Sequence, residues 1–170
     1  HLIKKTSQFS SSVNLNKKYL TEDNIFIFGI KPNSPSSQYG YFLTEKILKG
    51  LSKVVKFIEK PNTNDAKKII KKKAYWNSGV FFARKDSIIN NFRKYQLKTL
   101  NLCINSVNRS IISKNVTYLN KKSFSKVNEC SFDFAILEKT KNIYGIKLNI
   151  PWSDLGSWKE ISNIFKKNKS

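Results

Sequence analysis

The feature that most restricts the fold of this chain is an alternation of short apolar runs with stretches of helical periodicity. The runs Ile25 to Ile30 (IFIFGI) and Gly79 to Ala83 (GVFFA) are rich in β-branched and aromatic residues, which is typical of buried strands. Further strands are predicted from residue 39 onward and at 51–59, 116–119 and 143–150. Strands that alternate with helices and show no internal repeat indicate the α/β class, with a mixed, mostly parallel sheet flanked by helices.

The helical stretches are marked by their spacing and by polar residues that precede them. We expect a loosely periodic helix at 2–20, and a helix that starts at the polar stretch 62–65 and runs through Lys73. We also expect Asp86 to cap a helix that carries Ile88, Ile89 and Phe92, and a further helical segment at 97–112. The last two predicted helices are 131–139, capped by Ser131, and a segment from Ser157 through Phe165.

Composition excludes several classes of protein. A length of 170 residues suits one domain, and no apolar run approaches the roughly 20 residues of a membrane span. No apolar signal-peptide segment is present, and Cys103 and Cys130 are too few for a disulfide framework, so we expect free thiols in a cytoplasmic protein. The only histidine is His1, which excludes a histidine-centred catalytic triad or a histidine-rich metal site elsewhere in the sequence.

The charge is strongly positive, with 32 Lys and Arg against 11 Asp and Glu, a formal net charge of +21. Such a balance can mark a nucleic-acid-binding surface. However, all the cations except Arg84, Arg93 and Arg109 are lysines, and they are spread along the chain in short clusters. Because specific readers of bases and phosphates favour arginine, we interpret the charge as lysine enrichment on solvated surfaces, and we expect no nucleic-acid partner.

Ligands bind beyond the carboxyl ends of strands in open α/β sheets, so the loops at strand ends are the candidates for chemistry. In Gln38 to Tyr41 a glycine stands between two tyrosines, so that backbone at Tyr39 and Gly40 can approach a ligand; a packed strand edge is the alternative. At the end of the strand 51–59, Glu59 can accept hydrogen bonds from sugar hydroxyls and Lys60 can neutralise a phosphate; an exposed surface pair is the alternative. Pro61 should keep Lys60 in an extended conformation.

Two further loops combine polar and aromatic residues. In Trp76 to Gly79, Asn77 and Ser78 offer hydrogen-bond donors and acceptors beside an apolar strand, although ordinary turns have the same composition. In Pro151 to Trp158, Asp154 is the only acid between Glu138 and Glu160 and lies between two tryptophans. An isolated carboxylate of this kind suits Mg²⁺, which takes oxygen ligands, whereas the alternative is a turn or capping aspartate.

Six short motifs, taken in order, resemble those of bacterial mannose-1-phosphate guanylyltransferases, which belong to the nucleotidyltransferase superfamily. The motifs are FGIKP, YGY, FIEKP, WNSGVF, SFDFAILEK and WSDLGSW. The resemblance runs from about Ile25 to Trp158 and implies a Rossmann-like sheet of the nucleotide-diphospho-sugar transferase type. It implies that mannose 1-phosphate and GTP react to give GDP-mannose and pyrophosphate, by in-line attack of the sugar phosphate on the α-phosphorus. No protein nucleophile is needed, because Mg²⁺ and cations offset the charge.

The resemblance also implies roles for single residues. Tyr39 and Gly40 would lie against the sugar, Glu59 would hold its hydroxyls, and Lys60 would hold its phosphate as a catalytic cation. Asn77 and Ser78 would contact the hexose, and Asp154 would be a catalytic metal ligand for Mg²⁺. Asp133 and Glu138 would support the site from the SFDFAILEK helix.

The chain departs from the family pattern in ways that shape our expectations. It has no Gly-rich loop for gripping a nucleotide triphosphate, and it starts at His1, which resembles the histidine of a family Asp-His pair. We therefore expect residues 1–170 to be the C-terminal, sugar-binding part of a single nucleotidyltransferase domain, inactive when isolated. The alternatives are an enzyme that makes dTDP-, UDP- or ADP-sugars, a basic nucleic-acid-binding module and a non-catalytic regulatory relative. The oligomeric state stays open, with a homo-oligomer among the alternatives.

Overall fold

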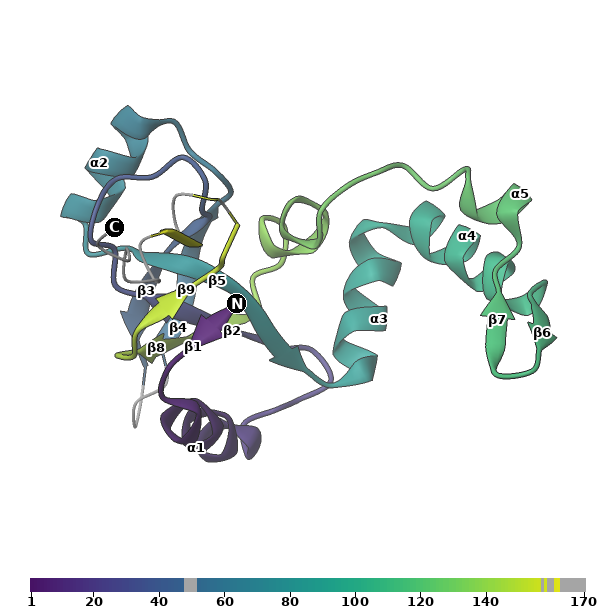
Figure 1. The fold of residues 1–170 in the computed structure, drawn as a ribbon, viewed down its shortest axis with the longest axis horizontal. Coiled ribbons are helices and arrows are strands. Elements are labelled where there is room, and N and C mark those ends of the chain that lie inside the picture. Colours follow the sequence, from purple (N-terminus) through teal and green to yellow (C-terminus); the bar gives the residue numbers. More distant parts are fainter. Residues whose placement is uncertain (48–51, 157, 159–160, 163–170) are drawn as a thin grey trace, which may run out of the picture.

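A closed sheet of mixed strands forms the centre of the computed structural model, which describes residues 1–47, 52–156, 158, 161 and 162 (Figure 1). Neighbouring strands follow the order β2-β5-β3-β4-β8. Their bounds are β2 Ile25–Ile30, β3 Tyr41–Lys46, β4 Ser52–Ile58, β5 Tyr75–Ala83 and β8 Ile143–Leu148. The predicted α/β class and the mixed character of the sheet are confirmed.

The direction of the strands corrects one detail of the prediction, because the sheet is not mostly parallel. Only β2 and β8 run parallel within it, whereas β2/β5, β3/β4, β3/β5 and β4/β8 are antiparallel in the described part of the chain. The connections explain this result. Residues 47–51 are too few for the crossover that a parallel pair of β3 and β4 would need, so these strands form a hairpin.

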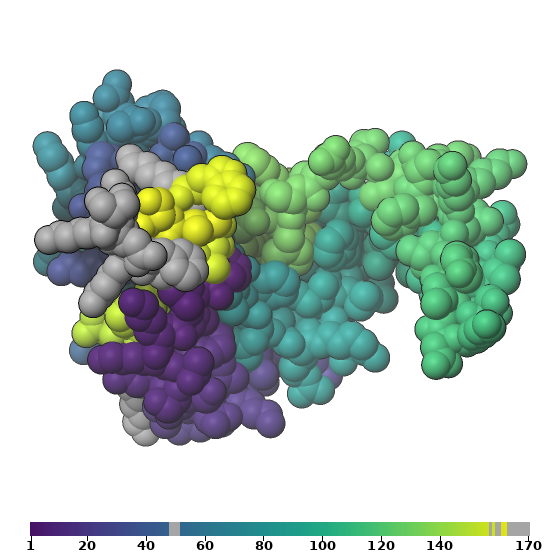
Figure 2. All heavy atoms as spheres, viewed as in Figure 1, coloured from purple at the N-terminus to yellow at the C-terminus, as the bar shows by residue number. Residues whose placement is uncertain are grey.

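Helices cover the sheet, and an arm projects from it. The helices are α1 Thr6–Lys17, α2 Thr63–Lys71, α3 Lys85–Tyr95, α4 Leu97–Asn108, α5 Lys121–Phe124 and the π-helix η1 Asp133–Leu137. The arm holds α4, α5 and a two-stranded ribbon of β6 (Ile111–Ser113) and β7 (Val116–Tyr118), and it stands clear of the body in the space-filling view (Figure 2). Among the described residues, no helix is both long and apolar enough to cross a membrane.

The core lies on both sides of β2, in which every residue is buried. Because side chains alternate along a strand, Phe26 and Phe28 join one apolar cluster with residues of α2 and β8, whereas Ile25 and Ile27 join a second cluster with η1. Helix α1 closes the first cluster, with the Phe9 and Phe28 rings 5.0 Å apart. This double burial explains why the run IFIFGI is apolar throughout instead of alternating.

Several helix predictions are confirmed and others need correction. Asn62 caps α2, with its side chain accepting a hydrogen bond from the Asp65 N–H at 2.9 Å. Asp86 does not cap α3, which begins after Arg84 and carries Asp86 in its first turn, where the carboxylate still suits the helix dipole. The helix predicted at 97–112 ends earlier, at Asn108. In the region 2–20, a short strand, β1 (Leu2–Ile3), comes first, and only the residues of α1 are helical. The predicted helix from Ser157 through Phe165 falls mostly outside the described residues.

Candidate functional site

A hollow of about 130 Å³ collects most of the predicted site residues at one end of the sheet. Its walls come from the residue before β1, the loop before β3, the end of β4, the middle of β5 and the start of η1. Strand β9 (Trp152–Ser153) and the loop after it complete the walls. The lining residues are His1, Gln38, Tyr39, Gly40, Glu59, Asn77, Ser78, Gly79, Asp133, Trp152 and Asp154. Glu59 follows the carboxyl end of β4, as expected for a strand-end site, whereas Gly40 precedes β3, and Asn77 lies within β5.

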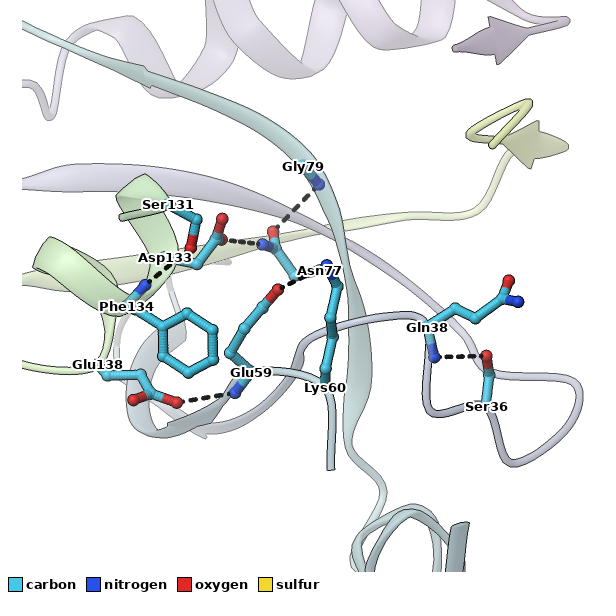
Figure 3. Close-up of polar contacts among 10 residues, drawn as sticks. All are labelled: Ser36, Gln38, Glu59, Lys60, Asn77, Gly79, Ser131, Asp133, Phe134 and Glu138. Carbon is cyan, nitrogen blue, oxygen red and sulfur yellow. Dashed lines mark hydrogen bonds and ion pairs between the residues drawn. The ribbon is translucent and has the colours of Figure 1, made fainter. Parts of the chain in front are cut away.

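The end of β4 turns sharply at Glu59 and Lys60 (Figure 3). The Glu59 side chain is only 7% exposed, whereas that of Lys60 is 59% exposed, and the Lys60 Nζ lies 3.8 Å from the Glu59 Oε1. Lys60 has a φ of 43°, so the prediction that Pro61 would keep it extended is wrong. The reversal of the chain between β4 and α2 requires this left-handed turn, a conformation that stores about 1–3 kcal/mol of strain in a non-glycine residue.

Gly40 sits directly against the Glu59 carboxylate. A Cβ at this position would lie 2.5 Å from the Glu59 Oε2 and 3.2 Å from the Phe57 Cζ. The Gly40 carbonyl accepts a hydrogen bond of 2.7 Å from the Asn77 N–H, which ties the loop before β3 to β5. Any larger residue at this position would have to displace the Glu59 carboxyl group, and with glycine the floor of the hollow consists of backbone atoms.

The polar residues of Trp76 to Gly79 lie within β5, not in a turn before it, so the predicted strand start at Gly79 is wrong. Ile27 of β2 pairs with Phe81, but Gly29 pairs with Asn77, so β5 carries extra residues across a bulge. Gly79, with a φ of +74°, provides the left-handed residue of this bulge. The bulge places Asn77 and Ser78, which are 8% and 2% exposed, at the wall of the hollow.

Two carboxylates of the SFDFAILEK segment hold these elements together. The Asp133 Oδ1 accepts a hydrogen bond of 2.8 Å from the Asn77 Nδ2, and the Glu138 Oε1 accepts one of 2.9 Å from the Glu59 N–H (Figure 3). The segment forms a π-helix where an α-helix was predicted. Ser131 does not occupy the cap position, which is Phe132, but its hydroxyl accepts a hydrogen bond of 3.3 Å from the Phe134 N–H. The resemblance gave both acids a supporting role; in addition, Asp133 lines the hollow itself.

Burial raises the pKa of two acids of the hollow, Glu59 and Asp133. Burial raises the pKa of Glu59 from its ordinary 4.5 to about 7; Asp133 also raises this pKa and Lys60 lowers it. Burial likewise raises the pKa of Asp133, against the lowering effects of its backbone hydrogen bond, of Lys60 and of Asn77. Near neutral pH the Glu59 carboxyl can therefore either donate or accept a hydrogen bond, which suits the recognition of a hydroxyl group.

A short antiparallel ladder brings the start of the chain to Asp154. Leu2 of β1 pairs with Ser153 of β9, and Ile3 pairs with Trp152. The His1 and Trp152 rings stack with centroids 5.9 Å apart, and Figure 2 shows the yellow atoms of this segment against the purple N-terminal ones. His1 and Asp154 therefore share the wall of the hollow.

Asp154 fits the requirements of a single magnesium ligand. Its Oδ1 accepts from the Gly156 N–H at 3.0 Å and lies 3.5 Å from the Tyr39 hydroxyl. Within the described ranges, no group of three or more His, Cys, Asp or Glu side chains could hold a metal ion. Mg²⁺ does not need such a group, because it is commonly bound by one or two carboxylates together with waters and substrate phosphates.

Sequence reasoning found most of the lining and missed part of it. Lys60 stands beside Glu59 but does not line the hollow, and Gln38, Gly79 and Trp152 line it without having been assigned a role. The signal for Asp133 was an acid in an otherwise apolar run, which the sequence alone could not connect to Asn77. A larger hollow of about 500 Å³, between β4 and the loop before β8, is lined in part by Glu138 but by none of the residues predicted to touch the substrate or the metal.

Comparisons with known proteins identify the family of the chain. The family model described as nucleotidyl transferase matches residues 1–170. A mannose-1-phosphate guanylyltransferase of Escherichia coli is 30% identical over 176 residues, which cover 100% of this chain and 38% of the relative. The xanthan biosynthesis protein XanB of Xanthomonas campestris pv. campestris is 28% identical, covering 96% of this chain and 35% of the relative.

A solved structure is similar in fold. The crystal structure of a mannose-1-phosphate geranyltransferase from Thermus thermophilus matches with a TM-score of 0.83 at 18% identity. The match covers 98% of this chain and 48% of that chain. The present chain thus spans well under half of the length of the two curated relatives.

Proposed function

Because the chain belongs to the nucleotidyl transferase family, we propose that it carries the sugar-phosphate side of a mannose-1-phosphate guanylyltransferase site. Family membership implies a nucleotide and a sugar phosphate as substrates. The names of the relatives at about 30% identity favour mannose 1-phosphate and GTP. The observation that supports this proposal most is the gathering of Gly40, Glu59, Asn77 and Asp154 around one small hollow, with Lys60 beside it.

The proposed roles follow from the chemistry of each group. Glu59 would exchange hydrogen bonds with sugar hydroxyls over the Gly40 backbone, and the Asn77 and Ser78 side chains would contact the same ring. The exposed Lys60 ammonium would neutralise the sugar phosphate, whose oxygen attacks the α-phosphorus of GTP while pyrophosphate leaves. No residue forms a covalent intermediate, so holding the phosphate in line is the main contribution of these side chains.

Asp154 is the residue that would hold Mg²⁺. The bound ion would supply positive charge to the phosphates. The chain's own part is to fix the carboxylate, which the Gly156 N–H and the β1/β9 ladder do. In the full natural protein, Asp154→Ala should abolish the response of activity to added MgCl₂, whereas the exposed Asp23→Ala should leave that response unchanged.

As part of the same proposal, we expect residues 1–170 alone to make little GDP-mannose, because they contain no Gly-rich loop to hold the triphosphate. The experiment is a GDP-mannose assay on the 170-residue chain and on the protein at its full natural length, with a panel of nucleoside triphosphates and hexose 1-phosphates. Rapid turnover by the short chain would refute this division of the site. Preference of the full protein for dTTP, UTP or ATP would assign it to another sugar-nucleotide class.

Replacing the Lys60 ammonium tests the phosphate contact. We predict that Lys60→Gln raises the KM for mannose 1-phosphate by roughly ten- to a hundredfold and lowers kcat, because a charge-assisted contact to the nucleophile is lost. Lys72→Gln, at the exposed end of α2, is the matched control and should leave both constants unchanged. An equal effect of both substitutions would attribute the loss to overall charge and contradict the assignment.

The compartment is part of the same proposal. The thiols of Cys103 and Cys130 are free in the structure, which is compatible with a cytoplasmic location, where thiols stay reduced.

A further inference from the structure

The π-helix η1 presents two acids on the same side of the chain. The Asp133 carbonyl accepts a hydrogen bond of 3.0 Å from the Glu138 N–H, which is the i to i+5 bond that defines a π-turn. In an α-helix, residues five positions apart point in directions that differ by roughly 140°. The π-turn instead brings both carboxylates to the face toward β4 and β5 (Figure 3).

Asp133 determines which way the Asn77 amide points. The Asp133 Oδ1 accepts a hydrogen bond of 2.8 Å from the Asn77 Nδ2, so the NH₂ end of the Asn77 amide faces Asp133. A backbone N–H only donates, and that of Gly79 lies 3.3 Å from the Asn77 Oδ1. Both partners enforce the same orientation and leave the second hydrogen of Nδ2 for another acceptor.

Glu138 holds the backbone at the turn formed by Glu59 and Lys60. Its Oε1 accepts from the Glu59 N–H at 2.9 Å, immediately before the left-handed Lys60. A single residue in this conformation is strained and keeps it only where its surroundings enforce it. The Glu138 hydrogen bond therefore helps to hold the turn that places the buried Glu59 carboxyl beside the exposed Lys60 ammonium, with 3.8 Å between the Lys60 Nζ and the Glu59 Oε1.

We propose that Asp133 and Glu138, placed together by the π-turn, are positioning residues that set the selectivity of this site for its hexose 1-phosphate. Asp133 acts through Asn77 and therefore on the sugar ring. Glu138 acts through the Glu59–Lys60 turn and therefore on both the hydroxyls and the phosphate. The inference rests on the proposed function for the class of substrate, but the two hydrogen bonds and the orientation they impose do not depend on it.

The test compares alanine and isosteric variants in the full natural protein. Glu138→Ala should raise the KM for mannose 1-phosphate roughly ten- to a hundredfold with little change in the KM for GTP, since the sugar-phosphate groups alone are displaced. Glu138→Gln should recover most of this loss, because its amide oxygen can still accept from the Glu59 N–H. Asp133→Ala should reduce the preference for mannose 1-phosphate over glucose 1-phosphate, with Asp133→Asn intermediate because an amide can present either end to Asn77.

Controls separate positioning from folding. Glu129→Gln, at an exposed acid in the loop before η1, should leave every constant unchanged, and thermal unfolding shows which variants fold. An equal rise in the KM for GTP and for the sugar phosphate, or no rescue by Glu138→Gln, would overturn the inference.

A second readout is independent of the reaction. In ¹⁵N-labelled protein, the side-chain amide signals of Asn77 should shift and exchange faster in Asp133→Ala but not in Glu129→Gln. If the wild-type protein prefers another hexose 1-phosphate, the proposed function fails, while the same variants measured with that sugar still decide the inference. If the wild-type protein uses no hexose 1-phosphate at all, unchanged Asn77 amide signals in Asp133→Ala would overturn the inference.

Discussion

At the scale of single residues, Gly40 is the position where the smallest change should have the largest effect on the hollow. Gly40→Ala would place a methyl group 2.5 Å from the Glu59 Oε2 and 3.2 Å from the Phe57 Cζ. We expect a loss of about 1–3 kcal/mol in the free energy of unfolding, which urea denaturation measures, together with weaker sugar-phosphate binding. If the carboxylate is the main obstacle, adding Glu59→Ala should recover part of the stability; strictly additive losses would contradict the contact.

The pKa of Glu59 leads to a second prediction at this scale. Because the carboxyl has a folded pKa of about 7 against an ordinary value of 4.5, the folded state binds more protons than the unfolded state between these values. The contribution of Glu59 to stability is therefore present below about pH 4.5, falls as the pH rises toward 7, and stays lost above it. In denaturation measured from pH 4.5 to about pH 8, Glu59→Gln should flatten this fall, whereas Glu22→Gln, at an exposed acid, should leave it unchanged.

At the scale of elements, α2 begins directly after the Glu59–Lys60–Pro61 turn and depends on Asn62. The Asn62 side chain accepts from the Asp65 N–H at 2.9 Å, which satisfies one of the free N–H groups at the helix start. Asn62→Ala should lower the free energy of unfolding by about 1 kcal/mol in a urea titration. Thr63→Ala, at the next position, keeps the cap and should have a smaller effect; equal losses would show that Asn62 does not act as a cap.

The elements also show how far the sequence predicts this site. Glu59 was found because a buried strand visibly ends there, and Gly40 because glycine between tyrosines predicts close approach. The bulge in β5 was missed, since Asn, Ser and Gly are equally typical of a turn, and only pairing with β2 distinguishes the two. The π-turn was missed for a similar reason, because DFAIL has the apolar pattern of an α-helix. The extra residue in the turn goes with contacts that Asp133 and Glu138 make to distant strands, and these contacts leave no local signal in the sequence.

At the scale of the whole molecule, long-range pairing completes the hollow. The two-residue strands β1 and β9 lie at opposite ends of the described chain, and their ladder places His1 near Asp154. Strands of this length carry no periodic signal, so the residue pattern alone could not place His1 near Asp154. The parallel pairing of β2 with β8, the strand that precedes β9 in the chain, is a second long-range contact. The site therefore depends on the closure of the sheet.

The net charge of the chain leads to the last prediction. The formal charge is +21, and the described residues contain only three ion pairs, Lys60–Glu59, Lys68–Asp65 and Arg84–Glu22. Mutual repulsion among lysines should therefore destabilise the compact state at low ionic strength. Because salt shortens the Debye length from roughly 30 Å at 0.01 M to about 10 Å at 0.1 M, we predict that the midpoint of thermal unfolding rises over this range of NaCl.

The choice of anion separates this general screening from a bound polyanion. Screening alone predicts similar midpoints in NaCl and in sodium phosphate of equal ionic strength, whereas occupation of the Lys60 site predicts extra stabilisation by phosphate that Lys60→Gln removes and Lys72→Gln does not. A midpoint that falls with added NaCl would contradict the repulsion argument. It would mean that attractive charge pairs outweigh the surplus of lysine, although two of the three ion pairs in the described part of the chain join well-exposed side chains.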